Sequence, residues 1–441
     1  MFTQHKTILR DLGNGLIMRR STPQDAQALA EFNGKIHGEN EADTRRVAAW
    51  THDLLARPHP TLKPNDFTIV EETATGRIVS SMNLIPQTWT YEGIDFGVGR
   101  PELVGTLPEY RNRGLVRAQF EVIHQWCAER GLVAQAITGI PYYYRLFGYE
   151  MALDLDGGRV GYEAGVPRLK DGEAETFCFR PAVEGDIPFI QEVYKTAASR
   201  NAIYAVRDEF IWRYELVGRS EENIARRYWE IIERNETHEP VGMLARWYHA
   251  GNYATLYELK ADASWLEVTP SVVRYLWNIA KQLQVQDGRP RPNFGFFHGN
   301  NHPVYQLLYD DLPEFRKPYA YFMRVPDITG FIRHIAPALE QRLVSSIAPG
   351  YSGEMKISFY QRGLLLRFEQ GKLTVNDWKP SPSEWGNVAF PELTFLQILF
   401  GYRSFAELHQ SFADCWWQTE TDRALIDILF PKRTSHVIPI G

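Results

Sequence analysis

The sequence predicts a mixed α/β (α+β) fold built in three parts, and three observations lead to this prediction. Short strand patterns alternate with amphipathic helix patterns at the start of the chain. One of these patterns returns roughly 160 residues later, and the last part of the chain does not repeat it. A chain of 441 residues is also too long for one compact core, which favours roughly two to four domains.

The first part opens with the pattern of a strand, a turn and an amphipathic helix. This stretch is GLIMRRSTPQDAQALAEFNGKI, with Ala28, Leu29 and Phe32 on one side of the expected helix. A second strand, DFTIVEE, follows, and Thr-Gly and Glu-Gly turns separate two more β-rich runs. We therefore expect an antiparallel meander of three strands that leads into residue 107.

The meander is followed by the pattern of a helix and another strand. Apolar side chains that include Phe120, Ile123 and Trp126 recur at helical spacing through residues 116–130, and Gly131 ends this pattern. The next seven residues, LVAQAIT, are almost entirely apolar and predict a short buried strand.

An internal repeat predicts a second copy of the first domain. IMRRSTPQDAQALAEF near residue 20 matches FCFRPAVEGDIPFIQEV near residue 180, and GIPYYYRLFGYE at 139–150 resembles GNNHPVYQLLYD at 299–310. We expect domains at residues 1–160 and 175–325, joined by a linker. Residues 326–441 carry a run of strands and then apolar helices, which predicts a separate α+β domain.

Composition and charge exclude several classes of protein. The net charge of −6 comes from 48 basic and 54 acidic residues mixed along the chain, which argues against a nucleic-acid partner. No signal-peptide pattern or stretch of about 18 apolar residues occurs, so we expect a soluble cytoplasmic protein without a membrane partner. Cys127, Cys178 and Cys415 are far apart in the sequence, so neither a disulfide nor a metal site is expected.

The stretch TLPEYRNRGLV, residues 106–116, has the features of a phosphate-binding turn. It lies between a predicted strand and a predicted helix, where unpaired backbone N–H groups and the positive end of the helix dipole favour an anion. Gly114 permits close approach of the backbone, and Arg111, Arg113 and Arg117 add positive charge. A pyrophosphate suits this combination. The stretch has neither a GK[ST] nor a GxGxxG pattern, which excludes the two commonest nucleotide-binding loops.

This stretch resembles the acetyl-CoA loop of the GCN5-related N-acetyltransferase (GNAT) superfamily. The family pattern [QR]-x-x-G-x-[GA] is matched from Arg111 to Val116, and the departure is Val116, where a small residue is usual. The resemblance implies acetyl-CoA as cosubstrate, with no metal. The expected acetyl-CoA-binding residues are Val104, Gly105, Thr106, Arg111, Asn112, Arg113, Gly114, Leu115, Val116 and Arg117.

The whole chain resembles a narrower group, the enhanced intracellular survival (Eis) type acetyltransferases. These enzymes have two tandem GNAT-like domains and a C-terminal domain similar to sterol carrier protein 2. The resemblance also implies that this protein assembles as a homo-hexamer. The resemblance implies that Tyr144, three residues before the FG pair, is the general acid, with Tyr143 as the alternative. It also implies that the carboxylate of Gly441 is the general base, although the family's last residue is aromatic; His436 or a chain of waters is the alternative.

Two further expectations concern the acceptor and the second copy. His37, Glu39 and Glu41 are candidates to accept the proton that the amine must lose before it attacks the thioester. They follow the first helix, where this fold places a substrate loop, and acidic groups there would attract a cationic amine; a solvated loop is the alternative. In the second copy, Asp262 and Glu267 stand where the arginines and the glycine would be needed, so a phosphate would be repelled. We therefore expect one acetyl-CoA site per chain.

The predicted function is acetyl transfer from acetyl-CoA to a primary amine by direct attack in a ternary complex. The resemblance offers aminoglycosides, other polyamines or protein lysines as acceptors. One alternative is a non-catalytic scaffold with a GNAT fold that binds CoA or a lipid. Another is transfer of a longer acyl or an aminoacyl group. In the last domain, the run FLQILFGY could form either a lipid tunnel or a filled core.

Overall fold

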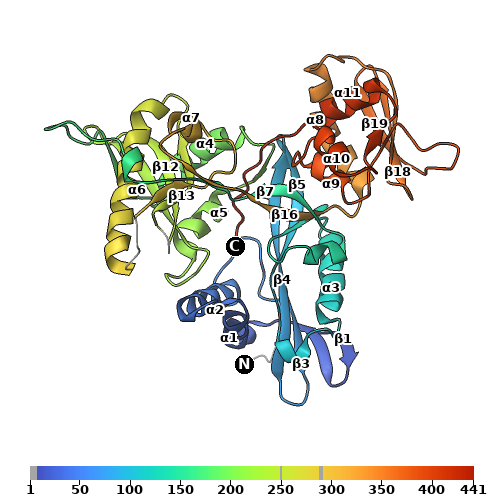
Figure 1. Cartoon of the computed structure of the whole chain (residues 1–441). Coiled ribbons are helices and arrows are strands. Elements are labelled where there is room, and N and C mark those ends of the chain that lie inside the picture. Colours follow the sequence, from blue (N-terminus) through green and yellow to red (C-terminus); the bar gives the residue numbers. More distant parts are fainter. Residues whose placement is uncertain (1–6, 249–250, 288–291) are drawn as a thin grey trace.

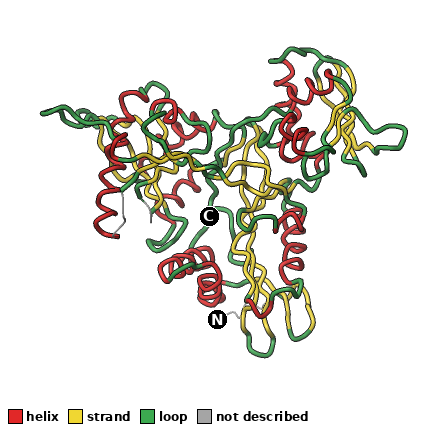
Figure 2. The backbone as a smooth tube through the Cα atoms, in the orientation of Figure 1, coloured by secondary structure: helices red, strands yellow, loops and turns green. Residues whose placement is uncertain are grey.

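The computed structural model describes residues 7–248, 251–287 and 292–441, and these form three β-sheets with surrounding helices (Figure 1). Parallel and antiparallel strand pairs occur within the same sheets, so the predicted mixed α/β fold class is confirmed. Loops and turns connect short elements throughout, as the tube in Figure 2 shows.

The first sheet is formed mainly by the N-terminal part of the chain. Its order is β1 (Ile8–Gly13), β2 (Leu16–Arg20), β3 (Phe67–Glu72), β4 (Arg77–Tyr91), β5 (Ile94–Thr106), β6 (Ala134–Ile137), β16 (Tyr319–Arg324) and β7 (Glu150–Leu155), and β10 (Ile203–Ala205) pairs with β4. Strands β3, β4 and β5 form the predicted antiparallel meander. The sequence pattern did not predict β1, which pairs with β2.

Three helices cover this sheet. Helices α1 (Ala26–His37) and α2 (Glu41–Ala56) lie on one side of the long β4–β5 pair in Figure 1, and α3 (Leu115–Glu129) lies on the other. Leu29 and Phe32 are buried as expected, but Ala28 is exposed because it lies on the outer side of α1. Gly131 follows α3 with a φ of +66°, a left-handed conformation that ends the helix as predicted.

The second sheet repeats the strand order of the first. Its order is β15 (Glu314–Arg316), β8 (Gly158–Gly161), β14 (Phe294–Phe296), β13 (Tyr253–Leu259), β12 (Pro240–Trp247), β11 (Arg227–Arg234) and β9 (Phe177–Pro181). The helices that follow or cover it are α4 (Ile187–Ala198), α5 (Glu209–Arg213), α6 (Trp265–Asp287) and α7 (Pro303–Leu307). In each sheet one parallel pair, β5–β6 or β13–β14, adjoins an antiparallel meander.

The two parts that carry the sequence repeat share one polar arrangement. Arg19 donates both terminal nitrogens to Asp25 at 2.9 and 2.8 Å and its Nε to Glu71 at 2.7 Å. Arg180 makes the same bonds to Asp186, at 2.7 and 2.8 Å, and to Glu233, at 2.7 Å. Each arginine thereby joins its strand to the turn before the next helix and to the neighbouring strand.

The two sheets exchange a strand with each other. After β7 the chain leaves the first sheet and adds β8 to the second, between β14 and β15. After β15 it returns and adds β16 to the first sheet, between β6 and β7. The sheets therefore cross the expected ranges 1–160 and 175–325: Tyr319–Arg324 belongs to the first sheet and Gly158–Gly161 to the second. The division into tandem GNAT-like domains stays a prediction.

The last part forms the third sheet, which has five strands. Its order is β19 (Lys372–Trp378), β18 (Gly363–Glu369), β17 (Gly353–Ser358), β20 (Val388–Ala389) and β21 (Trp416–Trp417), and its helices are α8 (Ile328–Val344), α9 (Phe395–Leu399), α10 (Phe405–Ser411) and α11 (Glu420–Leu429). The apolar side chains of α9 are buried in a core that also includes Trp89 and Phe96 of the first sheet. The likeness to sterol carrier protein 2 stays a prediction.

Candidate active site

The site begins where two parallel strands separate. β5 pairs with β6 at Val98–Ala134 and Gly99–Gln135, and the described pairing does not continue toward their carboxyl ends. Beyond that point β5 carries a bulge against β4, and Leu103 there has a φ of +52°. A β-bulge bends its strand and is common beside active sites, and a left-handed φ at a leucine costs energy that the surrounding fold must supply. The bulge leaves room between the two strands.

A cavity of about 670 Å³ occupies this opening. All of its walls come from the segment between Ile36 and Phe147, which includes α1, α2, β5 and the start of α3. Nine of the ten residues predicted to bind acetyl-CoA line it: Val104, Gly105, Thr106, Arg111, Asn112, Gly114, Leu115, Val116 and Arg117. The predicted catalytic residue Tyr144 also lines it.

One end of the cavity is a row of unpaired backbone donors. In the described residues, none of the six N–H groups from Asn112 to Arg117 has a hydrogen-bond acceptor, and the first bond of α3 is Ala118 N–H to Gly114 at 3.0 Å. Gly114 has a φ of +74°, and a Cβ placed there would meet no atom within 4 Å. This row of donors, at the positive end of α3, suits a phosphate group.

Three arginines add positive charge to this end, and in the described structure none of them pairs with a carboxylate. Arg111 and Arg117 line the cavity, and the Arg117 guanidinium lies 5.2 Å from the centre of the Phe147 ring. Arg113 does not line it, because its side chain lies over Tyr110 and donates to the carbonyl of Glu109 at 2.9 Å. Two of the three predicted cationic side chains therefore border the cavity.

Tyr144 lies in the wall of the cavity next to the turn at Gly139. It is 4% exposed, and a Cβ on Gly139 would stand 3.2 Å from its hydroxyl. That hydroxyl makes no hydrogen bond within the described residues. Burial raises the pKa of Tyr144 above its ordinary value, and burial also raises the pKa of the half-buried Tyr143. The phenol of Tyr144 is thus a protonated and unpaired donor at neutral pH.

The other end of the cavity lies against α1 and α2. Ile36, His37, Val47 and Trp50 line it, together with Glu102 from β5. The Nε2 atom of His37 and the Nε1 atom of Trp50 are buried without a hydrogen-bond partner in the described structure. Glu102 forms an ion pair with the buried Arg100. This end of the cavity is therefore mostly apolar.

Two acidic residues that were expected near the acceptor lie elsewhere. Glu39 and Glu41 are exposed and do not line the cavity. Glu41 begins α2, whose first turn is capped by Asn40 accepting from the N–H of Asp43 at 3.0 Å. Helix α2 was not predicted, although an Asn followed by acidic residues is a recognised start of a helix.

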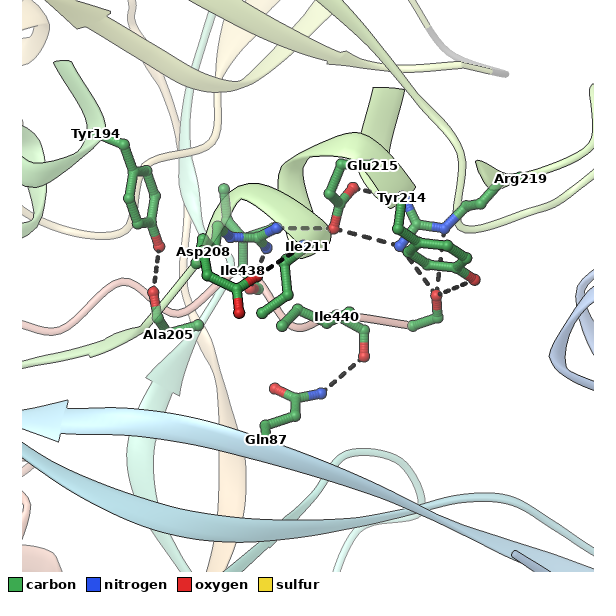
Figure 3. Close-up of polar contacts among 12 residues, drawn as sticks. Gln87, Tyr194, Ala205, Asp208, Ile211, Tyr214, Glu215, Arg219, Ile438 and Ile440 are labelled. Atoms are coloured by element: carbon green, nitrogen blue, oxygen red, sulfur yellow. Dashed lines mark hydrogen bonds and ion pairs between the residues drawn. The ribbon is translucent and has the colours of Figure 1, made fainter. Parts of the chain in front are cut away.

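Gly441 lies beside the cavity and does not line it. It is buried, and its oxygen accepts from Tyr214 at 3.1 Å and from Arg219 at 2.9 and 3.2 Å. Figure 3 shows Ile440 between these residues and Gln87 of β4, which donates to the Ile440 carbonyl at 2.7 Å. A Cβ on Gly441 would lie 3.5 Å from the Trp50 ring, so Trp50 packs against the end of the tail and also lines the cavity.

The corresponding part of the second sheet is filled by side chains. His298, His302 and Trp265 pack together there, with His298 and His302 ring centres 4.3 Å apart. At the position that matches Tyr144 in the repeat the second copy has Val304, which is buried. The acidic residues expected to repel a phosphate are partly engaged, since Asp262 lies near Lys260 and Glu267 near Arg234. His436, the alternative base, packs against His298 in this region, away from the cavity.

The described residues also bear on the expectations about metal sites, cysteines and membrane-spanning helices. Cys178, Glu233 and His238 bring possible metal ligands within 4.8 Å of one another, outside the cavity. The sequence analysis did not foresee this cluster, because β9 and β11 pair across 55 residues of sequence to place Cys178 opposite Glu233. The three cysteines are free thiols. Among the described helices, none combines the length and the apolar character needed to cross a membrane.

Comparison with known proteins agrees with the fold and with part of the sequence. Residues 18–152 match the family model of the acetyltransferase (GNAT) domain, which confirms the predicted GNAT resemblance of this segment. No protein of curated function matches the chain at a significant level.

Solved structures extend the likeness over nearly the whole chain. A protein from Enterococcus faecalis V583 described as "Probable N-Acyltransferase" has a TM-score of 0.64 at 14% identity, covering 97% of this chain and 100% of its own. A GCN5-related N-acetyltransferase from Anabaena variabilis gives 0.64 at 15%, covering 96% and 99%. Eis1 from Mycobacterium abscessus gives 0.58 at 11%, covering 97% and 99%. At these identities the likeness establishes the fold.

Proposed function

We propose, from the premise that residues 18–152 are a GNAT acetyltransferase domain, that this protein transfers an acetyl group from acetyl-CoA to a primary amine. The observation that carries the proposal is the row of six unpaired N–H groups from Asn112 to Arg117 at one end of a cavity that also contains Tyr144. Acetyl-CoA combines a diphosphate with a thioester at the end of a slender arm, so it requires both features.

The diphosphate fits the end formed by the start of α3. Its charge would be met by the N–H groups of Asn112–Arg117, by the positive end of the helix and by Arg111 and Arg117. Gly114 supports this placement because the space where its Cβ would stand is open. The narrower opening between β5 and β6 is the place for the arm that carries the thioester. Val116 lines the cavity but is half-buried, which leaves the row of donors accessible.

The chemistry needs little beyond positioning and proton transfer. The amine nitrogen attacks the thioester carbon, a C–N bond forms, and the C–S bond breaks as the tetrahedral intermediate collapses. The leaving thiolate takes a proton from the Tyr144 hydroxyl, which has no other partner, and solvent restores that proton. Tyr143 is the less suited alternative, because it is less buried than Tyr144.

Further parts of the proposal depend on the family resemblance. These are the second, degenerate GNAT-like domain without its own acetyl-CoA site, the C-terminal domain similar to sterol carrier protein 2, a homo-hexameric assembly and a cytoplasmic location. In the second sheet, the place that corresponds to the cavity is filled by His298, His302 and Trp265. This supports a single acetyl-CoA site per chain. Aminoglycosides, other polyamines and protein lysines are the acceptor classes that the resemblance offers.

Calorimetric titration with acetyl-CoA tests the proposal. We expect one bound molecule per chain, and loss of binding in Gly114→Asp, because a carboxylate and a side chain would enter the row of donors. The matched control is Gly172→Asp, since Gly172 also has a left-handed φ and open space around its missing Cβ but lies in the linker. No binding by the natural protein, or binding at two sites, would contradict the proposal.

A further inference from the structure

The cavity end formed by α1 and α2 has two buried polar atoms without partners. In the described residues these are Nε2 of His37 and Nε1 of Trp50, and both residues line the cavity. Leaving a buried polar atom unpaired costs roughly 1–3 kcal/mol, so such atoms in a cavity wall indicate a place where a ligand forms the missing bonds. The diphosphate and the thioester arm are assigned to the other end.

His37 lies close to the β5 bulge. It is the last residue of α1, and its ring lies near the backbone of Leu103. Its other nitrogen, Nε2, would stand 3.4 Å from a Cβ on Gly105, next to the opening between β5 and β6. Nε2 has no hydrogen-bond partner among the described residues, so it is free to take a proton. Burial lowers the pKa of His37, which keeps the ring neutral at pH 7.

The walls around His37 are apolar and carry little free charge. Ile36, Val47 and the Trp50 ring form most of the surface. The one carboxylate among the residues that line the cavity, Glu102, is paired with Arg100. The remaining titratable groups of the lining are Tyr110, Arg111, Arg117, Tyr143 and Tyr144. A polycationic acceptor would leave its additional ammonium groups against this surface without counterions.

We propose that this end is the acceptor subsite, that it takes a primary monoamine with an apolar body, and that His37 Nε2 receives the proton of the attacking amine. The proposal rests on the proposed acetyl transfer and names its acceptor class and base. An apolar body packs against Ile36, Val47 and Trp50, and the amine nitrogen lies between His37 and the thioester.

Proton transfers balance in this arrangement. As the C–N bond forms, the amine nitrogen becomes acidic and passes one proton to His37 Nε2. As the C–S bond breaks, the thiolate takes the proton of Tyr144, and both side chains then return to their starting states by exchange with solvent. The products are the N-acetylated amine and CoA with a free thiol, and no other reactant is needed.

Gly441 is less suited to be the base in this structure. Its oxygen is already held by Arg219 and Tyr214, and Gly441 is not among the residues that line the cavity. A guanidinium on an oxygen favours its unprotonated form, which lowers its ability to take a proton. The tail therefore supports the wall of the subsite by packing against Trp50.

The base is tested with His37→Gln and, as matched control, His52→Gln, which changes an exposed histidine on α2. We expect His37→Gln to lower kcat about 10²-fold at pH 7 with nearly unchanged calorimetric affinity for acetyl-CoA. The deficit should shrink toward pH 9, where the acceptor loses its proton to solvent. Because the folded pKa of His37 is lowered, the natural enzyme should lose kcat only as the pH falls below about 6.5. A kcat within threefold of the natural enzyme, or an equal deficit at every pH, would overturn the role of His37.

The acceptor class is tested with 2-phenylethylamine, spermidine, an aminoglycoside and a lysine peptide. We expect kcat/KM for 2-phenylethylamine to exceed that of the other three at least tenfold. A higher value for any of the three, or no acetylation of 2-phenylethylamine by a protein that binds acetyl-CoA, would overturn the subsite. Failure of the proposed function itself is distinguishable, because the titration would then show no acetyl-CoA binding.

Discussion

At the scale of single residues, the environment of Tyr144 decides what its side chain can do. A free phenol has a pKa of about 10, and burial in the cavity wall raises the pKa of Tyr144 further. Tyr144 therefore keeps its proton in the resting protein at neutral pH, as a proton donor to a departing thiolate must. The lack of a competing hydrogen bond within the described structure leaves it available.

Replacing Tyr144 by Phe should remove this donor with little change in shape. We expect kcat to fall on the order of 10²-fold, in line with the usual contribution of a general acid, and the acetyl-CoA affinity to stay nearly unchanged. Tyr143→Phe is the control, because Tyr143 lines the same cavity. Steady-state kinetics with calorimetry measures both quantities. If Tyr144→Phe keeps its kcat within a few-fold, or if Tyr143→Phe shows the larger loss, the assignment of the acid is wrong.

The row of unpaired backbone donors before α3 could be predicted from the sequence because its residues are adjacent in the chain. The six unpaired N–H groups from Asn112 to Arg117 surround one glycine and overlap the expected segment Arg111–Val116, and their geometry follows from a local turn and a helix start. His37, Trp50 and Tyr144 come from three different segments. From the sequence, Glu39 and Glu41 were candidates of the same rank as His37 for the acceptor end of the site. Only the packing of α1 against β5 shows that His37 lines the cavity and that the two glutamates do not.

At the scale of elements, Arg19 and Arg180 make the same hydrogen bonds to an Asp and a Glu, but the two arginine side chains differ in how deeply they are buried. The Arg19 side chain is 2% exposed and the Arg180 side chain 37% exposed, although both make the same bonds to an Asp and a Glu. Each links a strand, a short 3₁₀ turn and the neighbouring strand. Removing the arginine would leave its two carboxylates facing each other.

The two motifs should respond differently to the same substitution. Arg19→Met leaves two buried carboxylates unpaired, which should cost about 3–5 kcal/mol. Asp186 and Glu233 are similarly buried, at 14% and 10% exposed, but Arg180 is 37% exposed, so water can take the place of its guanidinium and Arg180→Met should cost less. Thermal unfolding of the two variants beside the natural protein measures the difference. Equal shifts of Tm, or a larger shift for Arg180→Met, would contradict the dependence on burial.

Most strands and helices of the first part could be predicted, because their apolar residues repeat with a clear period. Helix α2 was missed because the residues after the first helix were assigned to a substrate loop, although Val47, Trp50, Leu54 and Leu55 recur at helical spacing. The bulge at Leu103 was also missed, since nothing in the residues of β5 marks where an extra residue interrupts the pairing with β4.

At the scale of the whole molecule, the strand exchange joins the first two sheets into one unit. β7 pairs with β16, and β16 alone connects it to β6 in the described pairing. The first sheet is thus completed by residues 319–324, far beyond the end of its predicted domain. The tail that ends at Gly441 adds contacts between the first two parts, with Gln87 on one side and Arg219 on the other.

Truncation should reveal this dependence. A fragment of residues 1–160 lacks β16, so β6 becomes an open edge and β7 loses its partner. We expect this fragment to aggregate when expressed, whereas a fragment of residues 1–325 contains both exchanged strands and should be markedly more soluble. Size-exclusion chromatography and acetyl-CoA titration of both fragments test this. A monomeric fragment 1–160 that binds acetyl-CoA would show that the exchange is dispensable.

The sequence by itself determined the mixed α/β class, the repeat and the turn that precedes α3, because each depends on residues that are close together in the chain. Only the tertiary structure decided that the two sheets exchange β8 and β16, that Trp50 packs against Gly441 and lines the cavity, and that His37 lies beside the opening between β5 and β6. These relations depend on contacts between segments tens to hundreds of residues apart. Local periodicity and turn chemistry carry no record of which distant segment will become the neighbour.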